Sequence, residues 1–341
     1  MTDVSDLIVG VDGGGSKTHA VALTIDGELV GRGDGPGSSP HFFGVGHSVD
    51  IVDAAVRAAL AAASAGQASG PVAQANLYLS GLDLPPELAA YADAAAALPW
   101  TPPNTVVDND LWALLRSGTE SPDAVAVVCG TGINAIGVRA ATADVPAATA
   151  RFAALGPISG DWGGGSGLGE EALWHAARAE DGRGPETALH AAVLAGMGVG
   201  SVAELTQDLH FGRRALPDLA MLAPSVFAAA RDGDEVAIRI VDRQAAEIVS
   251  FARASLTRLG MLDRDVPVVL GGGVIRAGDE RLLAGITAGL AEVAPGTHIV
   301  WVDSPPIVGA GLLALESAAA GRPALERARD ELTKAYEREA V

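Results

Sequence analysis

A glycine-rich turn between two short apolar segments near the start of the chain most constrains the fold. Residues 7–11, Leu-Ile-Val-Gly-Val, have the length and composition of a buried strand, and residues 19–25 form a second apolar segment. Between them lies Asp12-Gly13-Gly14-Gly15-Ser16-Lys17-Thr18. Because the turn Asp26-Gly27 leads into a third strand at residues 28–32, the chain is predicted to open as an antiparallel meander. This is not how a Rossmann domain begins.

Such a turn can bind phosphate, because glycine has no side chain to keep the ligand away from the backbone N–H groups. Asp12 adds a carboxylate that could organise magnesium, and Lys17 adds a charge that could neutralise phosphate. The spacing is not that of the G-x-x-x-x-G-K-[ST] loop, so the turn taken alone fits an ordinary hairpin equally well.

The order of predicted elements indicates two related lobes. Helices are predicted at residues 48–65, 85–97 and 110–117, and strands at 76–80 and 105–108. A second meander follows, in which the turn Gly130-Thr131-Gly132 joins apolar segments at 124–129 and 134–138. It echoes the first meander about 118 residues earlier, which is a weak internal repeat.

The second half of the chain is predicted to be mostly helical from residue 168, with breaks near 181–186 and 210–218. A late buried strand at 266–270 ends in Gly271-Gly272-Gly273, which could make room for a nucleotide base or simply allow tight packing of a strand on a helix. The last strand is predicted at 297–302. Two helices then close the chain, the second running from Pro323 to about Glu339.

Composition excludes several classes of protein. Hydrophobic residues make up 49% of the 341, but no apolar stretch approaches the ~20 residues of a membrane span. The acidic residues 1–6 lack the basic and apolar regions of a signal peptide, so we expect a cytoplasmic protein without a membrane partner. A net charge of −19 without a basic patch argues against nucleic acid. The single cysteine, Cys129, excludes an internal disulfide framework.

Several motifs occur in an order that resembles the BadF/BadG/BcrA/BcrD-type ATPase family, within the actin-like ATPase superfamily. They are Gly10-Val-Asp12-Gly-Gly-Gly-Ser-Lys-Thr18, Ser80-Gly81-Leu82-Asp83, Asn109-Asp110, Gly130-Thr131-Gly132-Ile-Asn134, Gly160-Asp161-Trp162-Gly163-Gly164-Gly165-Ser166-Gly167, Leu270-Gly-Gly-Gly273 and Pro306-Ile-Val-Gly309-Ala310. The resemblance covers nearly the whole chain, and the order of the motifs is more specific than any one of them.

The resemblance implies an α/β fold of the actin-like ATPase (ribonuclease H-like) type, with two lobes that each contain a mixed five-stranded sheet and flanking helices. The smaller lobe is expected to comprise residues 1–115 and about 318–341, and the larger lobe 116–317, with nucleotide and sugar in the cleft between them. The same resemblance implies ATP and Mg²⁺ as cofactors.

The family pattern also assigns roles to residues of this sequence. Asp110 would be the catalytic base and Asp12 would orient magnesium through water. Asp108 is the alternative base, and a helix cap is the alternative role for either aspartate. The residues implied for ATP binding are Gly13, Gly14, Gly15, Lys17, Thr18, Gly130, Thr131, Gly132, Gly271, Gly272 and Gly273.

The residues implied for sugar binding are Asp161, Asn134, Asp83, Ser80 and Trp162. Trp162 departs from the family, because related N-acetylglucosamine kinases have a glutamate there; it could stack on a sugar ring or support the loop. Asp83 could instead cap the helix that starts at Pro85. The sequence Ser38-Ser39-Pro40-His41 stands where the family often supplies an asparagine, so this part of the pocket departs too.

Residues 160–171 resemble the actinobacterial glucosamine kinases, which implies transfer of the γ-phosphoryl group of ATP to the 6-hydroxyl of glucosamine. Asp161, Asp83, Glu170 and Glu171 are candidates to face the cationic amine. The alternatives are a kinase for N-acetylglucosamine or another hexose and, less favoured, a dehydratase-activating ATPase, whose iron–sulfur cluster needs more thiolates than Cys129 supplies. A small-molecule amino sugar is the expected partner, and a homodimer is left open.

Overall fold

The computed structural model describes residues 6–66 and 68–337, so the acidic residues 1–5 and the predicted helical positions 338 and 339 lie outside the described residues. The chain forms two compact units. The first comprises Met1–Ala124, Arg151–Ala153 and Val300–Val341, and the second comprises Val125–Ala150 and Ala154–Ile299. Each unit is built on a mixed five-stranded sheet with flanking helices, which confirms the predicted fold class.

The sheet of the first unit has the strand order β3-β2-β1-β4-β5. Its strands are β1 (Leu7–Gly13), β2 (Lys17–Thr24), β3 (Leu29–Pro36), β4 (Val72–Leu79) and β5 (Val106–Asn109). The antiparallel pairs β1–β2 and β2–β3 form the predicted meander, whereas β1–β4 and β4–β5 are parallel. The carboxyl ends of β1, β4 and β5 therefore lie at the same edge of the sheet.

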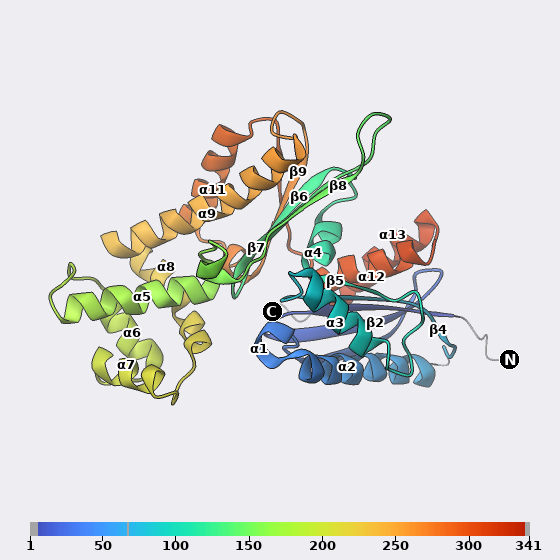
Figure 1. The fold of residues 1–341 in the computed structure, drawn as a ribbon, viewed down its shortest axis with the longest axis horizontal. Helices are drawn as coiled ribbons and strands as arrows, with labels where there is room; N and C mark the ends of the chain where they lie inside the picture. Colours follow the sequence, from blue (N-terminus) through green and yellow to red (C-terminus); the bar gives the residue numbers. More distant parts are fainter. Residues whose placement is uncertain (1–5, 67, 338–341) are drawn as a thin grey trace. The chain divides into compact units, whose positions relative to one another are not determined.

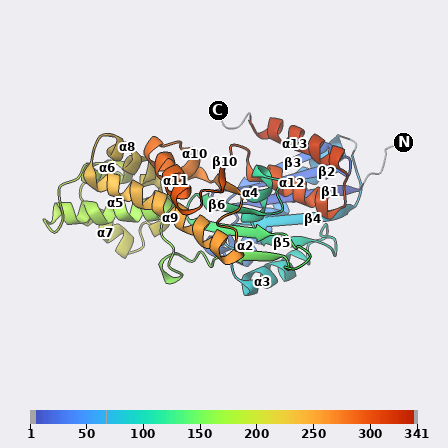
Figure 2. The same cartoon turned by 90° about the horizontal axis from the view of Figure 1, so that it is seen from above.

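The helices of the first unit are α1 (Pro40–Phe43), α2 (Val45–Ala65), α3 (Pro85–Ala95), α4 (Leu111–Gly118), α12 (Pro306–Ser317) and α13 (Arg322–Glu337). They cover both faces of the sheet (Figures 1 and 2). Because side chains alternate along a strand, Val9 of β1 packs on the α2 and α3 side, whereas Ile8 packs against α12 and α13. Burial of each large apolar side chain contributes roughly 1.5–3 kcal/mol.

The packing of α12 places the boundaries of the first unit. The expected lobes divided at 115/116 and 317/318, whereas the compact units divide at 124/125 and 299/300. Helix α12 packs directly on β1 and α4, which places α12 in the first unit. Since this contact is between distant segments, no local pattern in the sequence marks it.

The sheet of the second unit has the order β10-β9-β6-β7-β8. Its strands are β6 (Ala124–Cys129), β7 (Ile133–Arg139), β8 (Ala148–Arg151), β9 (Pro267–Gly271) and β10 (His298–Trp301). The parallel pairing of β6 with β9 sets Val128 opposite Gly271. The turns that follow these two strands, at 130–132 and 271–273, therefore meet at one edge of the sheet. The sequence did not predict β8, which has only four residues and no apolar run.

The other elements of the second unit are η1 (Gly156–Ile158), α5 (Gly164–Glu180), α6 (Leu189–Met197), α7 (Val202–His210), η2 (Leu216–Leu222), α8 (Ala223–Arg231), α9 (Glu235–Leu259), α10 (Gly273–Arg276) and α11 (Glu280–Val293). Helices α5 to α8 gather together, and the long α9 packs on β7 and α11 (Figure 1). Asp234 caps α9 by accepting the N–H of Ala237.

Among the helices that the structure describes, none by itself has the length and hydrophobicity needed to span a membrane. Only α6 and α7 taken together meet that test, and they are bent by 54°.

Candidate active site

Three aspartates lie near the carboxyl ends of the parallel strands in the first unit. Asp12 is at the end of β1, Asp83 is in the loop between β4 and α3, and Asp110 directly follows β5. The backbone N–H of Asp110 donates to the carbonyl oxygen of Leu79 at 3.3 Å, which ties its position to the end of β4. Such an edge is where open α/β sheets commonly bind their ligands.

The environment of Asp110 favours a protonated carboxyl group. Burial raises the pKa of Asp110 to about 8 from an ordinary 3.8, and the negative charges of Asp12 and Asp83 contribute to the rise. Although the residue keeps some exposed surface, its carboxyl is enclosed closely enough for desolvation to be the largest cause. A carboxylate whose pKa lies near neutrality can both accept and return a proton at physiological pH.

Two alternatives were left open, namely Asp108 as the base and a helix-capping role for Asp110, and the structure bears on both. Asp108 accepts hydrogen bonds from Arg151 Nη2 on both carboxylate oxygens at 2.7 Å, so it is engaged in an ion pair. Asp110 immediately precedes α4 but its side chain makes no capping hydrogen bond. The cap is supplied instead by Asn109, whose Oδ1 accepts the N–H of Leu111 at 3.0 Å.

Asn109 also holds Asp83, because its Nδ2 donates to Asp83 Oδ1 at 2.9 Å. The helix role proposed for Asp83 belongs in the structure to Glu87, whose carboxylate accepts the backbone N–H groups of Asp83 and Leu84. Nearby, the Oγ of Ser80 is buried without a hydrogen-bond partner among the described residues. The backbone N–H of Ser80 donates to Gly13, which joins this loop to the first glycine turn.

The first glycine turn is closed by its own backbone, since the N–H of Gly14 donates to the carbonyl oxygen of Lys17 at 2.9 Å. Lys17 is exposed at the start of β2. Thr18, in contrast, is fully buried, and its hydroxyl is hydrogen-bonded to the Pro36 carbonyl and the Ser38 hydroxyl, both at 2.7 Å. These contacts give Thr18 a structural role beside the turn, whereas Gly13 to Gly15 and Lys17 form the turn itself.

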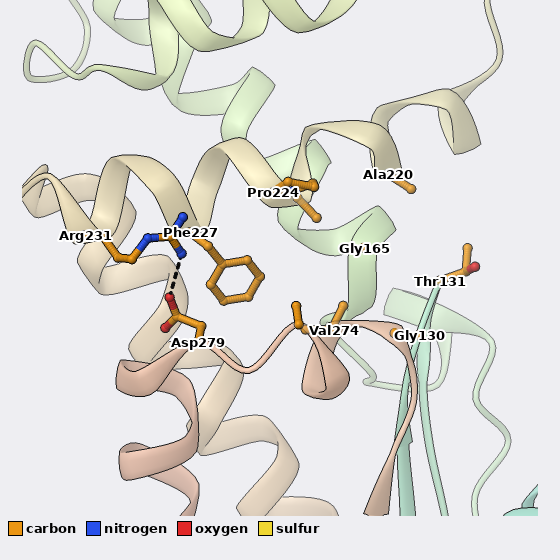
Figure 3. A pocket seen from close by; sticks show the side chains of 12 residues that line it. Gly130, Thr131, Gly165, Ala220, Pro224, Phe227, Arg231, Val274 and Asp279 are labelled. Atoms are coloured by element: carbon orange, nitrogen blue, oxygen red, sulfur yellow. Dashed lines mark hydrogen bonds and ion pairs between the residues drawn. The ribbon is translucent and has the colours of Figure 1, made fainter. Parts of the chain in front are cut away.

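The second unit holds a cavity of about 390 Å³ where the two later glycine turns meet. Figure 3 shows Gly130 and Thr131 on one side, Val274 below, and Pro224 and Phe227 of α8 opposite. Of the residues predicted to bind ATP in this unit, Gly130, Thr131 and Gly273 line the cavity, whereas Gly132, Gly271 and Gly272 are not among the lining residues.

Gly272 does not line the cavity, but it packs closely on the end of strand β6 next to it. Its φ of 101° lies in a region that favours glycine, and a Cβ there would collide with the backbone of Cys129 at the end of β6. This close approach holds the turn at 271–273 against the turn at 130–132. Of the two alternatives left open for this turn, room for a nucleotide base remains a prediction, and the close contact at Gly272 is with the end of strand β6 and not with a helix.

The cavity is lined mainly by apolar side chains, with a few polar groups among them. Its apolar walls come from Pro224, Phe227 and Val274, and an ion pair at one end joins Arg231 Nη1 to Asp279 Oδ2 at 3.1 Å (Figure 3). A small number of polar groups in an apolar lining is typical of nucleotide and cofactor sites. No pattern in the sequence marked the α8 residues, because an Ala- and Pro-containing helix with one Phe resembles ordinary core.

The loop that starts α5 lies against the same glycine turn. The N–H groups of Gly165 and Ser166 donate to the carbonyl oxygens of Gly130 and Thr131 at 2.8 and 2.9 Å. In this loop Asp161 is buried and accepts a hydrogen bond from Ser159. Asn134, also buried, lies on β7, just after the turn at 130–132.

Trp162 and the two glutamates of α5 are also placed by the structure. Trp162 Nε1 donates to Glu171 Oε1 at 3.2 Å, and the guanidinium of Arg243 lies 3.9 Å from the centre of the Trp162 ring. Arg243 also bonds Glu171 at 3.0 Å. Glu171 is therefore engaged by Trp162 and Arg243 and also lies 3.6 Å from His175 Nε2, whereas Glu170 is exposed on the surface of α5.

The described residues contain no group of three His, Cys, Asp or Glu side chains placed to chelate a metal. Magnesium in phosphoryl-transfer sites usually keeps several waters and takes one or two carboxylates together with substrate phosphates. Asp12, buried at the end of β1 next to the first glycine turn, fits that kind of site.

A sequence model of the BadF/BadG/BcrA/BcrD ATPase family matches residues 9–314. The N-acetyl-D-glucosamine kinase of Dictyostelium discoideum is 26% identical over 324 residues, which cover 92% of this chain and 98% of that protein. The N-acetylmuramic acid/N-acetylglucosamine kinase of Clostridium acetobutylicum is 26% identical over 79% of this chain and 85% of its own.

Among solved structures, one from Chromobacterium violaceum, described as a "Putative N-acetylglucosamine Kinase", is similar with a TM-score of 0.70. Its sequence is 24% identical, and the match covers 91% of this chain and 99% of that one. At this identity the likeness shows the fold.

Proposed function

This chain belongs to the BadF/BadG/BcrA/BcrD ATPase family, and we propose that it is an ATP-dependent amino-sugar kinase, a phosphotransferase with an alcohol acceptor. The observation that carries the proposal is the state of Asp110. Its carboxyl group has no capping role, lies near two other carboxylates, and has its pKa raised to about 8. Perturbed carboxyl groups of this kind are typical of acid–base catalysts.

In the proposed reaction Asp110 accepts the proton of the 6-hydroxyl of the sugar while that oxygen attacks the γ-phosphorus of ATP in line. The new bond joins the sugar oxygen to phosphorus, the bond to the β,γ-bridging oxygen breaks, and ADP leaves. The proton stays on Asp110 until the product departs. Asp83, held by Asn109, is proposed to bind a sugar hydroxyl next to the base.

The nucleotide is proposed to place its base in the cavity against Phe227 and Val274, with its phosphates toward the turn that contains Gly130 and Thr131. In the first unit, Gly13 to Gly15 and Lys17 are proposed as phosphate-binding residues. Bound magnesium would neutralise phosphate charge, and Asp12 is the residue proposed to hold it through water.

The two candidate substrates are glucosamine and N-acetylglucosamine. The names of the two curated relatives favour N-acetylglucosamine as the first substrate to test. Two of the carboxylates proposed to bind an amine already have hydrogen-bond partners, which also favours N-acetylglucosamine. Glu171 is bonded by Trp162 and Arg243, and Asp83 is bonded by Asn109. Asp161, proposed to bind sugar hydroxyls, remains the candidate that would recognise the amine of glucosamine.

The test is ATP-dependent formation of sugar phosphate with glucosamine, N-acetylglucosamine, glucose and no sugar. We expect an amino sugar to be phosphorylated in preference to glucose, with the phosphate on the 6-oxygen as seen by ³¹P-coupled NMR. ATP hydrolysis that is indifferent to every sugar would overturn the proposal. Activity on glucose alone would keep the reaction and overturn the choice of amino sugars.

A further inference from the structure

Two consecutive residues of α9, Arg243 and Gln244, both hold the glycine-rich loop at residues 161–165. This loop carries Asp161 and Trp162, the proposed sugar contacts of the second unit, and it leads into α5. No sequence motif includes Arg243 or Gln244, since each lies in the middle of the long helix α9.

Gln244 is completely buried, and its Oε1 accepts the backbone N–H of Gly164 at 2.8 Å. The side chain also occupies the space beside Gly163, where a Cβ would lie 2.7 Å from the Gln244 amide. Gly163 and Gly164 have φ angles of 128° and 71°, so the loop depends on glycine at both positions. One glutamine thus fixes the conformation of two consecutive glycines.

Arg243 holds the neighbouring part of the loop. Its guanidinium lies on the face of Trp162, 3.9 Å from the ring centre, while Nη1 bonds Glu171. Glu171 in turn accepts from Trp162 Nε1. The three side chains therefore form a closed set of contacts that fixes the orientation of the indole ring.

The same loop is joined to the proposed phosphate turn through the bonds from Gly165 and Ser166 to Gly130 and Thr131. A Cβ on Gly164 would collide with the backbone of Gly132. The loop consequently lies between α9 on one side and the turn at 130–132 on the other, with α9 supplying its side-chain supports.

We propose that Arg243 and Gln244 are positioning residues for the sugar: Gln244 fixes the backbone of the loop at 161–165, and Arg243 fixes the Trp162 ring. The inference rests on the proposed function, in which Asp161 and Trp162 contact the sugar. It predicts that losing either side chain weakens sugar binding and turnover, while nucleotide binding changes little because the backbone bonds of Gly165 and Ser166 remain.

The amide of Gln244 is not fully hydrogen-bonded, as that of a purely structural buried glutamine would be. Its Nε2 is buried without a hydrogen-bond partner among the described residues. An unsatisfied buried donor destabilises a fold, and an apolar side chain of similar shape would remove that penalty. The retained amide is therefore explained by what its oxygen does for Gly164.

The first experiment measures KM for the sugar, KM for ATP and kcat in Gln244→Met and Gln244→Glu. The methionine lacks the acceptor for Gly164, whereas the glutamate keeps an oxygen there but adds an ionisable buried group. We expect Gln244→Met to raise the sugar KM roughly tenfold, with KM for ATP within about twofold. We expect Gln244→Glu to keep more activity than Gln244→Met although it is the less stable protein.

Gln74→Met is the matched control, because Gln74 is also buried but its amide bonds Asn76 and Asn104, which belong to the first unit. It is expected to lower the melting temperature and leave both KM values unchanged. The proposal is overturned if the Gln244 variants lose activity only in step with their stability, as a structural residue would.

The second experiment uses Arg243→Gln, with Arg239→Gln as its control. Arg239 lies one turn earlier on α9, and its ion pair with Glu235 is long, at 4.0 Å. Both variants remove one surface charge, but only the first uncovers Trp162. We expect Arg243→Gln to raise the sugar KM several-fold and to change the tryptophan fluorescence response to sugar, and Arg239→Gln to do neither. Equal behaviour of the two variants would overturn the role of Arg243.

Amide hydrogen exchange supplies a readout that does not depend on turnover. In Gln244→Met the peptide containing Gly164 should exchange faster than in the unaltered protein, and in Gln74→Met it should not. If the unaltered protein phosphorylates no sugar, the proposed function fails and the sugar role falls with it. If it phosphorylates an amino sugar but the variants match their controls, only the inference about α9 fails.

Discussion

The amide of Asn109 donates to the carboxylate of Asp83 at 2.9 Å, and this bond joins the loop after β4 to the residue that caps α4. It holds a negative charge close to Asp110 while relieving Asp110 of the capping role. The arrangement explains how a carboxyl group at a helix start, where the ordinary role is structural, can have a pKa suited to proton transfer.

Replacement of Asp110 by asparagine should abolish most turnover. We expect kcat to fall by about 10²- to 10⁴-fold, because asparagine cannot accept the proton of the sugar hydroxyl, while the Kd of ATP changes little. Coupled kinase assays and calorimetry would measure the two quantities. Asp108→Asn is the control: it breaks the ion pair with Arg151 and should reduce kcat much less. A larger loss in Asp108→Asn than in Asp110→Asn would assign the base to Asp108.

The pH dependence of kcat/KM should report the Asp110 carboxyl. Since the base must be deprotonated, activity is expected to rise with pH through a limb near the pKa of about 8. Asp83→Asn removes one of the charges that raise this pKa, so its limb should move to lower pH even as its sugar KM rises. A limb that stays in place in Asp83→Asn would contradict the coupling between the two carboxyl groups.

The raised pKa of Asp110 should also make the stability of the folded protein fall as pH rises. Asp110 binds its proton more tightly in the folded chain, with a pKa of about 8, than at its ordinary value of 3.8. As pH rises between these values, the unfolded chain releases the proton and the folded chain retains it, so folding loses stability. Asp110→Asn lacks this effect.

The melting temperature of Asp110→Asn relative to the unaltered protein should therefore increase from pH 5 to pH 8 and level off above. Differential scanning calorimetry at pH 5, 6.5, 8 and 9 would measure it. A difference that is constant across this range would contradict a raised pKa of Asp110.

Two neighbouring glycines should respond differently to alanine. A Cβ on Gly272 would collide with Cys129, so Gly272→Ala should lower the melting temperature. A Cβ on Gly273 meets no protein atom within 4 Å, but the residue lines the cavity. Gly273→Ala should therefore fold normally and raise the KM of ATP by roughly tenfold. An unchanged KM for ATP in Gly273→Ala would argue against a nucleotide in this cavity.

Thr18 provides a test of the residues predicted from the motif alone. Thr18→Val removes the hydroxyl that bonds Pro36 and Ser38, so we expect a loss of about 1 kcal/mol in the free energy of unfolding. The KM of ATP should stay within about twofold. A rise in the KM of ATP with unchanged stability would instead indicate that Thr18 binds phosphate.

Much of the fold could be predicted from local patterns. The short apolar segments and glycine turns at residues 7–25 and 124–138 predicted two meanders, and the structure contains both sheets. Strand β8 escaped prediction because four residues without an apolar run leave no period to detect. The ends of the two compact units depend on α12 packing against β1 and α4, a contact that no local pattern in the sequence marks.

The sequence by itself determined the glycine turns and the order of the motifs, because backbone freedom and hydrophobic periodicity are properties of neighbouring residues. Only the tertiary structure decided which of Asp108 and Asp110 is tied up in an ion pair, that Thr18 is buried, and that Phe227 and Arg231 face the turn at 130–132. Hydrogen bonds, burial and charge interactions join residues that are distant in the chain. The pKa of Asp110 and the supports from α9 are of this kind, so they exist only once the chain has folded.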